Sequence, residues 1–242
     1  MHARGASRTL APVSFYIEPG MIPSVLKSRS DTKTQVIDGL ARLRATFPLE
    51  QRLRDAAPAV RATYAQVLAH WLRAMPPSTC ALNSDALSAL VRLDAVVADE
   101  YGLGCYPFST HNTGIRVTLP NGSVHAMCAI DALAIARLAR VRTGIDANCA
   151  NCGATVVIHV EENGGLDHEQ AEAARVIWRH AGDAHTSASL GLCRHIRFLC
   201  NACPAPEASE HFTLPQAAAI GNAFFGFQSA LLAAHALSAA KP

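Results

Sequence analysis

The strongest constraint on this sequence is a hairpin that leads directly into an apolar helix. Two apolar runs, GIRVTL and SVHAMC, flank the turn sequence Pro-Asn-Gly at 120–122. Asn-Gly favours the tight turn that joins two antiparallel strands. The second run continues into an Ala-rich apolar stretch, which predicts a helix from Cys128 to about Arg142. We therefore expect a fold that packs a sheet against a buried helix.

Helical patterns come before this hairpin, and mixed patterns follow the helix. Helices are expected over 33–44, over 49–75 with an interruption near Pro58, and from Asn83 or Ser84 to Gly102. Later in the chain we expect strands over 154–160 and 191–200, a helical stretch over 168–181, and apolar C-terminal helices. This order predicts an α+β fold, with an N-terminal winged-helix-like helical module followed by a mixed β-sheet core with packed helices.

The same patterns divide the chain into three parts. Residues 1–34 have no clear period and are expected to form a poorly ordered leader. Residues 35–127 make the winged-helix-like module with its hairpin, and residues 128–242 make a second α+β domain. Winged-helix modules often bind DNA, but the formal net charge is only +2 and no basic stripe is present. A packing scaffold is therefore favoured, and no nucleic-acid partner is expected.

Cysteine usage bears on the cellular compartment. The chain has eight cysteines, and its first twenty residues contain too many Arg and Pro residues for the apolar core of a secretory signal. We therefore expect a reducing, cytoplasmic setting in which clustered cysteines bind metals or act as reactive thiols. Residues 211–240 lack charge, but Pro, Gly, Asn and Gln interrupt them, so buried helices are favoured over a membrane span.

Four of the cysteines form two Cys-x-x-Cys pairs. Cys149 and Cys152 precede one expected strand, and Cys200 and Cys203 follow another, with 47 residues between the pairs. Two such pairs have the spacing of a structural four-thiolate zinc site. Free thiols and disulfides are the alternatives. A redox role is disfavoured because neither pair opens an expected helix.

A different cysteine lies at the start of the central helix. Cys128 and Asp131 are three residues apart and therefore share one helix face, among apolar neighbours. A thiol beside a carboxyl group is poor packing, but it suits a site where a ligand is bound and protonated. The helix N-terminus is expected to lower the pKa of Cys128 towards the reactive thiolate.

Two motifs in this order resemble the organomercurial lyase (alkylmercury lyase) family. The first is CAID at 128–131, which follows the hairpin in the run from Cys105. The second is CRHIRF at 193–198, whose cysteine lies 65 residues after Cys128. Together with the preceding helical module and the apolar C-terminal helices, the resemblance extends over about residues 60–235.

The resemblance implies an enzyme that cleaves carbon–mercury bonds by protonolysis. Cys128 and Cys193 would correspond to the thiols that hold the mercury, and Asp131 to the acid that protonates carbon. Mercury is a soft metal that prefers thiolates, and an apolar setting raises a carboxyl pKa towards that of a general acid. The products would be a hydrocarbon and thiolate-bound Hg(II). The family needs no organic cofactor, and mercuric reductase is the expected acceptor of the Hg(II).

The sequence departs from the family pattern in places. Met127 stands where the family commonly has Trp before the first cysteine, which bears on contacts with the organic group. Cys152, Cys200 and Cys203 are additions, which would bind zinc or pass mercury onward. Tyr106 and Phe108 are candidates either for lining the substrate pocket or for core packing.

The alternative function is a thiolate metal sensor or carrier, for zinc or a soft metal, without bond cleavage. Asp131 separates the two hypotheses, because a sensor needs only thiolates whereas cleavage also needs a proton donor. A lyase-like relative with another substrate is a third interpretation of the same residues.

Overall fold

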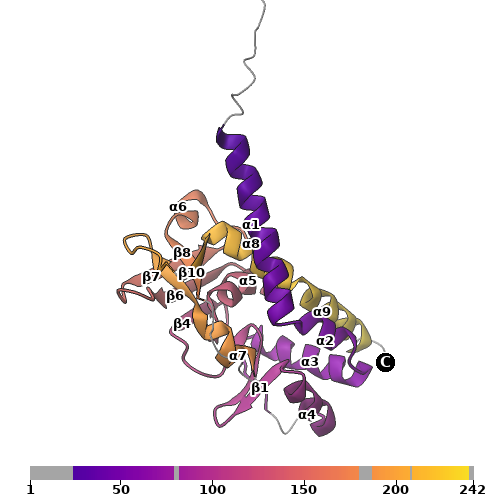
Figure 1. Ribbon diagram of the computed structural model, residues 1–242. Coiled ribbons are helices and arrows are strands. Elements are labelled where there is room, and N and C mark those ends of the chain that lie inside the picture. Colours follow the sequence, from indigo (N-terminus) through magenta and orange to yellow (C-terminus); the bar gives the residue numbers. More distant parts are fainter. Residues whose placement is uncertain (1–23, 79–81, 180–186, 208, 240–242) are drawn as a thin grey trace, which may run out of the picture.

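The computed structural model describes residues 24–78, 82–179, 187–207 and 209–239, and it confirms the α+β class (Figure 1). The helices α1 to α4 come first in the chain: Ser24–Thr46, Leu49–Arg54, Pro58–Trp71 and Ser84–Arg92. The strands β1 to β5 follow: Val96–Asp99, Gly102–Cys105, Phe108–Ser109, Ile115–Leu119 and Gly122–Ala126. After the central helix α5, Ala129–Ala139, come β6, Thr143–Asn148, and β7, Thr155–Val160.

The last part of the chain contains a second sheet and two long helices. Its elements are α6, His168–Ala171; β8, Ala174–Arg179; α7, Ala188–Gly191; a 3₁₀ turn, Cys193–His195; β9, Ile196–Cys200; β10, Ser209–Thr213; α8, Leu214–Phe224; and α9, Gly226–Ala239. The larger sheet has the order β1-β2-β3-β5-β4-β6-β7, and the smaller has the order β10-β8-β9. Every pairing among these strands is antiparallel, where the sequence patterns predict a mixed sheet. Most neighbouring strands follow each other closely in the chain, and such connections give antiparallel pairs.

The hairpin and the helix that follows it form as predicted. In the hairpin, Leu119 pairs with Gly122, whose φ of +150° suits glycine. Cys128 caps α5, which ends at Ala139, just before Arg140 in the left-handed conformation with a φ of 56°. Nearly every residue of α5 is buried, so the apolar stretch forms the centre of the core rather than one amphipathic face.

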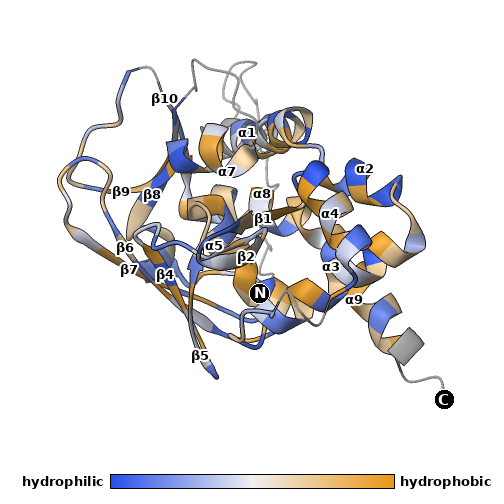
Figure 2. Cartoon of the chain, turned by 90° about the horizontal axis from the view of Figure 1, so that it is seen from below, coloured by the Kyte–Doolittle hydropathy of each residue, from blue (hydrophilic) through white to orange (hydrophobic). Residues whose placement is uncertain are grey.

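Helix α5 lies between the sheets and the other helices. Figure 2 shows the strands from β4 to β10 on one side, α2, α3, α4 and α9 on the other, and α5 and α8 between them. Helix α8 crosses α5 so closely that a Cβ at Gly221 would lie 2.6 Å from the carbonyl oxygen of Ile130. This contact fixes the first turn of α5 in place.

Two segments differ from the helices predicted for them. The helix that starts after the Asn83 cap ends at Arg92, and residues 96–99 form β1, because Val96 and Val97 pair with β2. Residues 174–179 form β8 rather than part of a helix over 168–181. The β-branched and aromatic residues of β8 pair on both sides, with β9 and β10, and this tertiary pairing overrides the helical propensity of the preceding Ala and Glu residues.

The N-terminal helix begins at Ser24, so residues 24–34 of the expected leader belong to α1, and residues 1–23 lie outside the described part. Helix α1 packs along α8 (Figure 1), and α3 packs on α9. The domain boundary at 127/128 stays a prediction; strands from both sides of it share the larger sheet. No single described helix is long and apolar enough to cross a membrane, and α8 and α9 pass that test only as a pair bent by 41°.

Candidate active site and comparison with known proteins

Cys128 is the N-cap of α5. Its side-chain sulfur accepts a hydrogen bond from the backbone N–H of Asp131 at 3.4 Å. Serine and aspartate are the usual residues at such a position, because their oxygens satisfy the free N–H groups of the first turn. Here a thiol takes that role, and only 2% of Cys128 is exposed. The sulfur is therefore held in one position by the start of the helix.

Asp131 lies in the first turn of the same helix. It is 5% exposed and is one of few buried charged or polar side chains among the described residues. Burial raises the pKa of Asp131 to about 7. At neutral pH the carboxyl group is therefore able both to take up and to release a proton.

Cys193 completes the site from the turn that leads into the smaller sheet. It lies in the 3₁₀ turn before β9, whereas the sequence pattern predicted a strand over the whole of 191–200. Its thiol points at Asp131, with 3.7 Å between Cys193 Sγ and Asp131 Oδ2. The side-chain ligand atoms of Cys128, Asp131 and Cys193 all lie within 4.8 Å of one another. One metal ion is thus within reach of both sulfurs and the carboxylate.

The two thiols are not thiolates in the unloaded site. Burial raises the pKa of Cys128, although its place at a helix N-terminus predicts a lower one. The hydrogen bond with Cys128, together with burial, raises the pKa of Cys193 well above its ordinary value. The loss of hydration thus outweighs the helix dipole at Cys128. Each thiol therefore releases its proton when a metal binds rather than beforehand.

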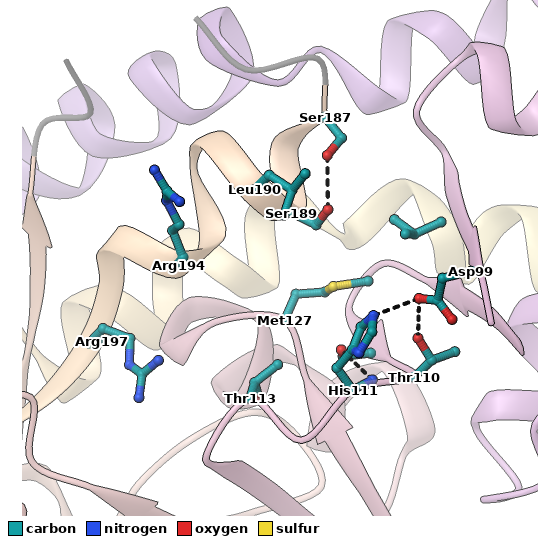
Figure 3. Close-up of a pocket in the computed structure, with 12 residues that line it drawn as sticks. Asp99, Thr110, His111, Thr113, Met127, Ser187, Ser189, Leu190, Arg194 and Arg197 are labelled. Atoms are coloured by element: carbon teal, nitrogen blue, oxygen red, sulfur yellow. Dashed lines mark hydrogen bonds and ion pairs between the residues drawn. The ribbon is translucent and has the colours of Figure 1, made fainter. Parts of the chain in front are cut away.

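A cavity of about 350 Å³ lies next to this site, lined by Met127 and Arg194, the chain neighbours of Cys128 and Cys193, rather than by the three site residues themselves (Figure 3). Met127, the neighbour of Cys128, crosses the middle of the view, and Leu190 and Arg194 come from α7 and from the 3₁₀ turn that contains Cys193. The opposite wall carries Asp99, which binds His111 at 2.7 Å and Thr110 at 2.8 Å. The lining combines apolar side chains, among them Met127 and Leu190, with polar ones, which suits a small organic group bound to a metal.

Tyr106 supports the cavity wall rather than lining the cavity. Its hydroxyl group donates to Asp94 Oδ1 at 3.2 Å and accepts from the backbone N–H of Ser189 at 2.8 Å. Asp94 Oδ2 accepts from the N–H of Ala188 at 2.8 Å. Tyr106 and Asp94 therefore hold the start of α7 together, and the sequence position of Tyr106 does not reveal this role. Phe108 is fully buried and stacks on Trp71 at 5.6 Å, so it belongs to the core.

The other four predicted metal ligands meet at a second place. The sulfurs of Cys149, Cys152, Cys200 and Cys203 also lie within 4.8 Å of one another. Cys149 and Cys152 lie in the loop between β6 and β7, and the other pair lies at the end of β9. Cys105 lies in neither cluster, and Cys80 lies outside the described residues.

Comparison with known proteins gives the family. Residues 108–226 match the family model of alkylmercury lyase. The fold resembles that in the crystal structure of the mercury-bound form of MerB2, with a TM-score of 0.58 and 18% sequence identity, over 74% of this chain and 96% of that chain. None of the curated proteins matches the sequence. The resemblance inferred from the two cysteine motifs is thus confirmed: residues 108–226 of this chain match the alkylmercury lyase domain.

Proposed function

We propose that Cys128, Asp131 and Cys193 perform the carbon–mercury cleavage of this alkylmercury lyase. The observation that carries the proposal is the convergence of two buried thiols and one buried carboxyl group within 4.8 Å, beside a cavity. Soft thiolates bind mercury, and the carboxyl group supplies what a metal-binding site alone does not need.

Binding of the substrate R–Hg–X begins with loss of X from mercury. The Cys128 sulfur replaces X, and the Cys128 proton leaves with X as HX. A metal-bound thiol is far more acidic than a free one, so the approach of Cys193 to the same mercury releases the second proton. The Cys193 thiol already points at Asp131 Oδ2, which makes the Asp131 carboxylate the acceptor of that proton.

Cleavage then uses the proton held by Asp131. Two thiolate ligands increase the electron density on mercury and weaken its bond to carbon. The electron pair of the Hg–C bond takes the Asp131 proton, which gives R–H and leaves Asp131 ionised. In total, R–Hg–X and two thiols give R–H, dithiolate-bound Hg(II) and HX, so atoms and charges balance. A carboxyl group whose pKa burial raises to about 7 suits both halves of this transfer.

The cavity is the proposed place for the organic group R. Val97, Met127 and Leu190 supply its apolar lining. An alkyl or aryl group bound there is shielded from water, which would otherwise compete for the proton and the thiolates. Asp99 and His111 add a polar part to the same lining (Figure 3).

Hydrocarbon release tests the proposal directly. The purified protein is incubated with methylmercury and excess thiol, and methane in the headspace is measured beside mercury bound to the protein after desalting. We expect methane from the wild type and from Cys105→Ala, a buried thiol outside the site. Asp131→Asn should retain mercury without methane, and Cys128→Ser and Cys193→Ser should lose both. Methane release by Asp131→Asn at the wild-type rate would exclude this carboxyl group as the proton donor.

The product Hg(II) has to leave two thiolates, so a thiol-bearing acceptor must remove it. We propose mercuric reductase for that role and the cytoplasm as the compartment, because the reaction consumes reduced thiols.

A further inference from the structure

We propose that Cys149, Cys152, Cys200 and Cys203 bind one zinc ion, which joins the edges of the two sheets. The site is distinct from the mercury site, since it shares no residue with it. Its pairs come from the β6–β7 loop and from the end of β9. Strands β7 and β9 are each at the edge of their sheet, and the described strands of the two sheets do not pair with each other.

The sulfur separations fit a tetrahedral zinc site. Cys149 Sγ lies 3.8 Å from Cys203 Sγ, and Cys152 Sγ lies 3.7 Å from Cys200 Sγ. Four sulfurs placed about 2.3 Å from one zinc ion, at the corners of a tetrahedron, are about 3.8 Å apart. A disulfide needs sulfurs about 2.05 Å apart, so these pairs are free thiols.

The backbone around Cys149 has the form of a metal-binding turn. The N–H of Cys200 donates to Cys149 Sγ at 3.4 Å, and the N–H groups of Asn151 and Cys152 point at the same sulfur. The turn closes with a bond from the N–H of Gly153 to the carbonyl oxygen of Cys149 at 3.0 Å. Gly153 has a φ of +73°, which explains a glycine directly after the second cysteine. Such N–H groups stabilise the negative charge of a metal-bound thiolate.

Further contacts tie the two pairs together around the site. The N–H of Ala150 donates to the carbonyl oxygen of Phe198 at 2.9 Å. The side-chain amide of Asn151 donates to the carbonyl oxygen of Pro204 at 3.1 Å. Arg175 donates to the carbonyl oxygen of Cys203 at 2.6 Å, and Arg179 donates to Asn151 at 3.2 Å. Four thiolates on Zn²⁺ carry a net charge of about −2, and these two arginines lie where they offset it.

A four-sulfur set leaves no open position for a substrate, so the proposed role is structural. The closed site holds β9 against the β6–β7 end, and the 3₁₀ turn with Cys193 directly precedes β9. Zinc therefore helps to keep Cys193 opposite α5. The assignment rests on the sulfur geometry and is independent of the proposed mercury chemistry.

Metal content and a cobalt spectrum test the proposal. Protein expressed with zinc in the medium should contain one zinc per chain by mass spectrometry of the metals. The protein refilled with Co²⁺ should show sulfur-to-cobalt charge-transfer bands and the intense visible bands of a tetrahedral four-thiolate site. Cys152→Ser and Cys203→Ser should lose the metal or change the cobalt spectrum. Cys105→Ala and the double variant Cys128→Ser with Cys193→Ser should keep both signals.

Three results would overturn the assignment. The first is a wild type without zinc and without the four-thiolate cobalt spectrum. The second is one iron per chain in place of zinc. The third, stoichiometric zinc release during the first turnover of methylmercury, followed with a chromophoric chelator, would overturn the structural role of the site, because it would make the cluster a mercury relay. A wild type that releases methane but lacks the zinc and cobalt signals would reject the zinc site alone, and a wild type that shows these signals but releases no methane would reject the lyase mechanism alone.

Discussion

The thiol of Cys193 lies 3.7 Å from Asp131 Oδ2, although the two residues are 62 positions apart in the chain. One comes from a turn at the edge of the smaller sheet and the other from the buried helix α5. The contact places a proton donor, a proton acceptor and a metal ligand in one apolar space.

The buried Asp131 should make stability depend on pH. Its pKa is raised by burial to about 7 in the folded protein, against about 3.9 in an unfolded chain. Between these values the folded state keeps a proton that the unfolded state has lost. The free energy of unfolding therefore falls as pH rises from about 4 to 7, by at most about 4 kcal/mol, and then levels off.

Denaturant unfolding at several pH values checks this expectation. Asp131→Asn should lack the decline, so its stability relative to the wild type should increase from pH 5 to pH 8. Asp146→Asn, which removes a half-exposed carboxylate paired with Arg116, is the control and should leave the decline in place. A pH-independent difference between Asp131→Asn and the wild type would mean that Asp131 is ionised throughout this range.

Tyr106→Phe should weaken the wall of the cavity. The change removes the hydrogen bond to Asp94 and leaves the N–H of Ser189 without its partner. We expect a loss of about 1–3 kcal/mol of stability. Because α7 lines the cavity, KM for organomercurials should rise several-fold while kcat changes less. Tyr101→Phe, at an exposed tyrosine, is the control, and equal KM values in the two variants would contradict this role.

Gly221→Ala should disturb the contact between α8 and α5. The new Cβ would lie 2.6 Å from the carbonyl oxygen of Ile130 and 3.2 Å from the Cβ of Ala134. Forcing the helices apart should cost about 1–3 kcal/mol and lower kcat, because Ile130 precedes Asp131. Gly226→Ala is a matched control, since a Cβ there meets nothing within 4 Å. Comparable unfolding midpoints for the two variants would show that α8 shifts without cost.

Met127→Ala should widen the accepted range of organic groups. Met127 is only 8% exposed, and its terminal methyl group lies 3.2 Å from the position that a Cβ at Gly104 would take. Removing most of the side chain enlarges the cavity next to Cys128. We expect kcat/KM for phenylmercury to rise relative to that for methylmercury, with Met75→Ala, an exposed methionine, as the control. An unchanged ratio would place the organic group elsewhere.

The sequence alone predicts the part of the fold that depends on local patterns. The turn at Asn121-Gly122, the start of the helix at Cys128 and the apolar run of α5 each depend on a few residues, and they form as expected. Strand β8 was wrongly predicted as helix because its pairing with β9 and β10 depends on residues that are distant in the chain. The 3₁₀ turn at Cys193 was missed because the residues that follow it are in a strand.

The sequence likewise predicts the parts of the site that depend on local spacing, and misses those that depend on distant residues. Spacing on one helix suggests that Cys128 and Asp131 act together, but it does not bring in Cys193, which only the family resemblance supplied. The pairing of four cysteines could be proposed from spacing, whereas the closing of the 47-residue gap between the pairs depends on how the two sheets pack. Burial depth is also invisible locally, so the pKa of Cys128 is raised by burial where the helix N-terminus predicted the opposite.

Helix α5 is enclosed on nearly every side, and this limits how such an enzyme can change during evolution. Substitutions beside Asp131 on α5 alter the core of the whole protein and are selected against for stability. Leu190 on α7 is 57% exposed and lines the cavity from the opposite side, so it is free to vary. New substrate preferences should therefore arise by substitutions on α7 and at the cavity rim, while the residues that perform the chemistry stay fixed.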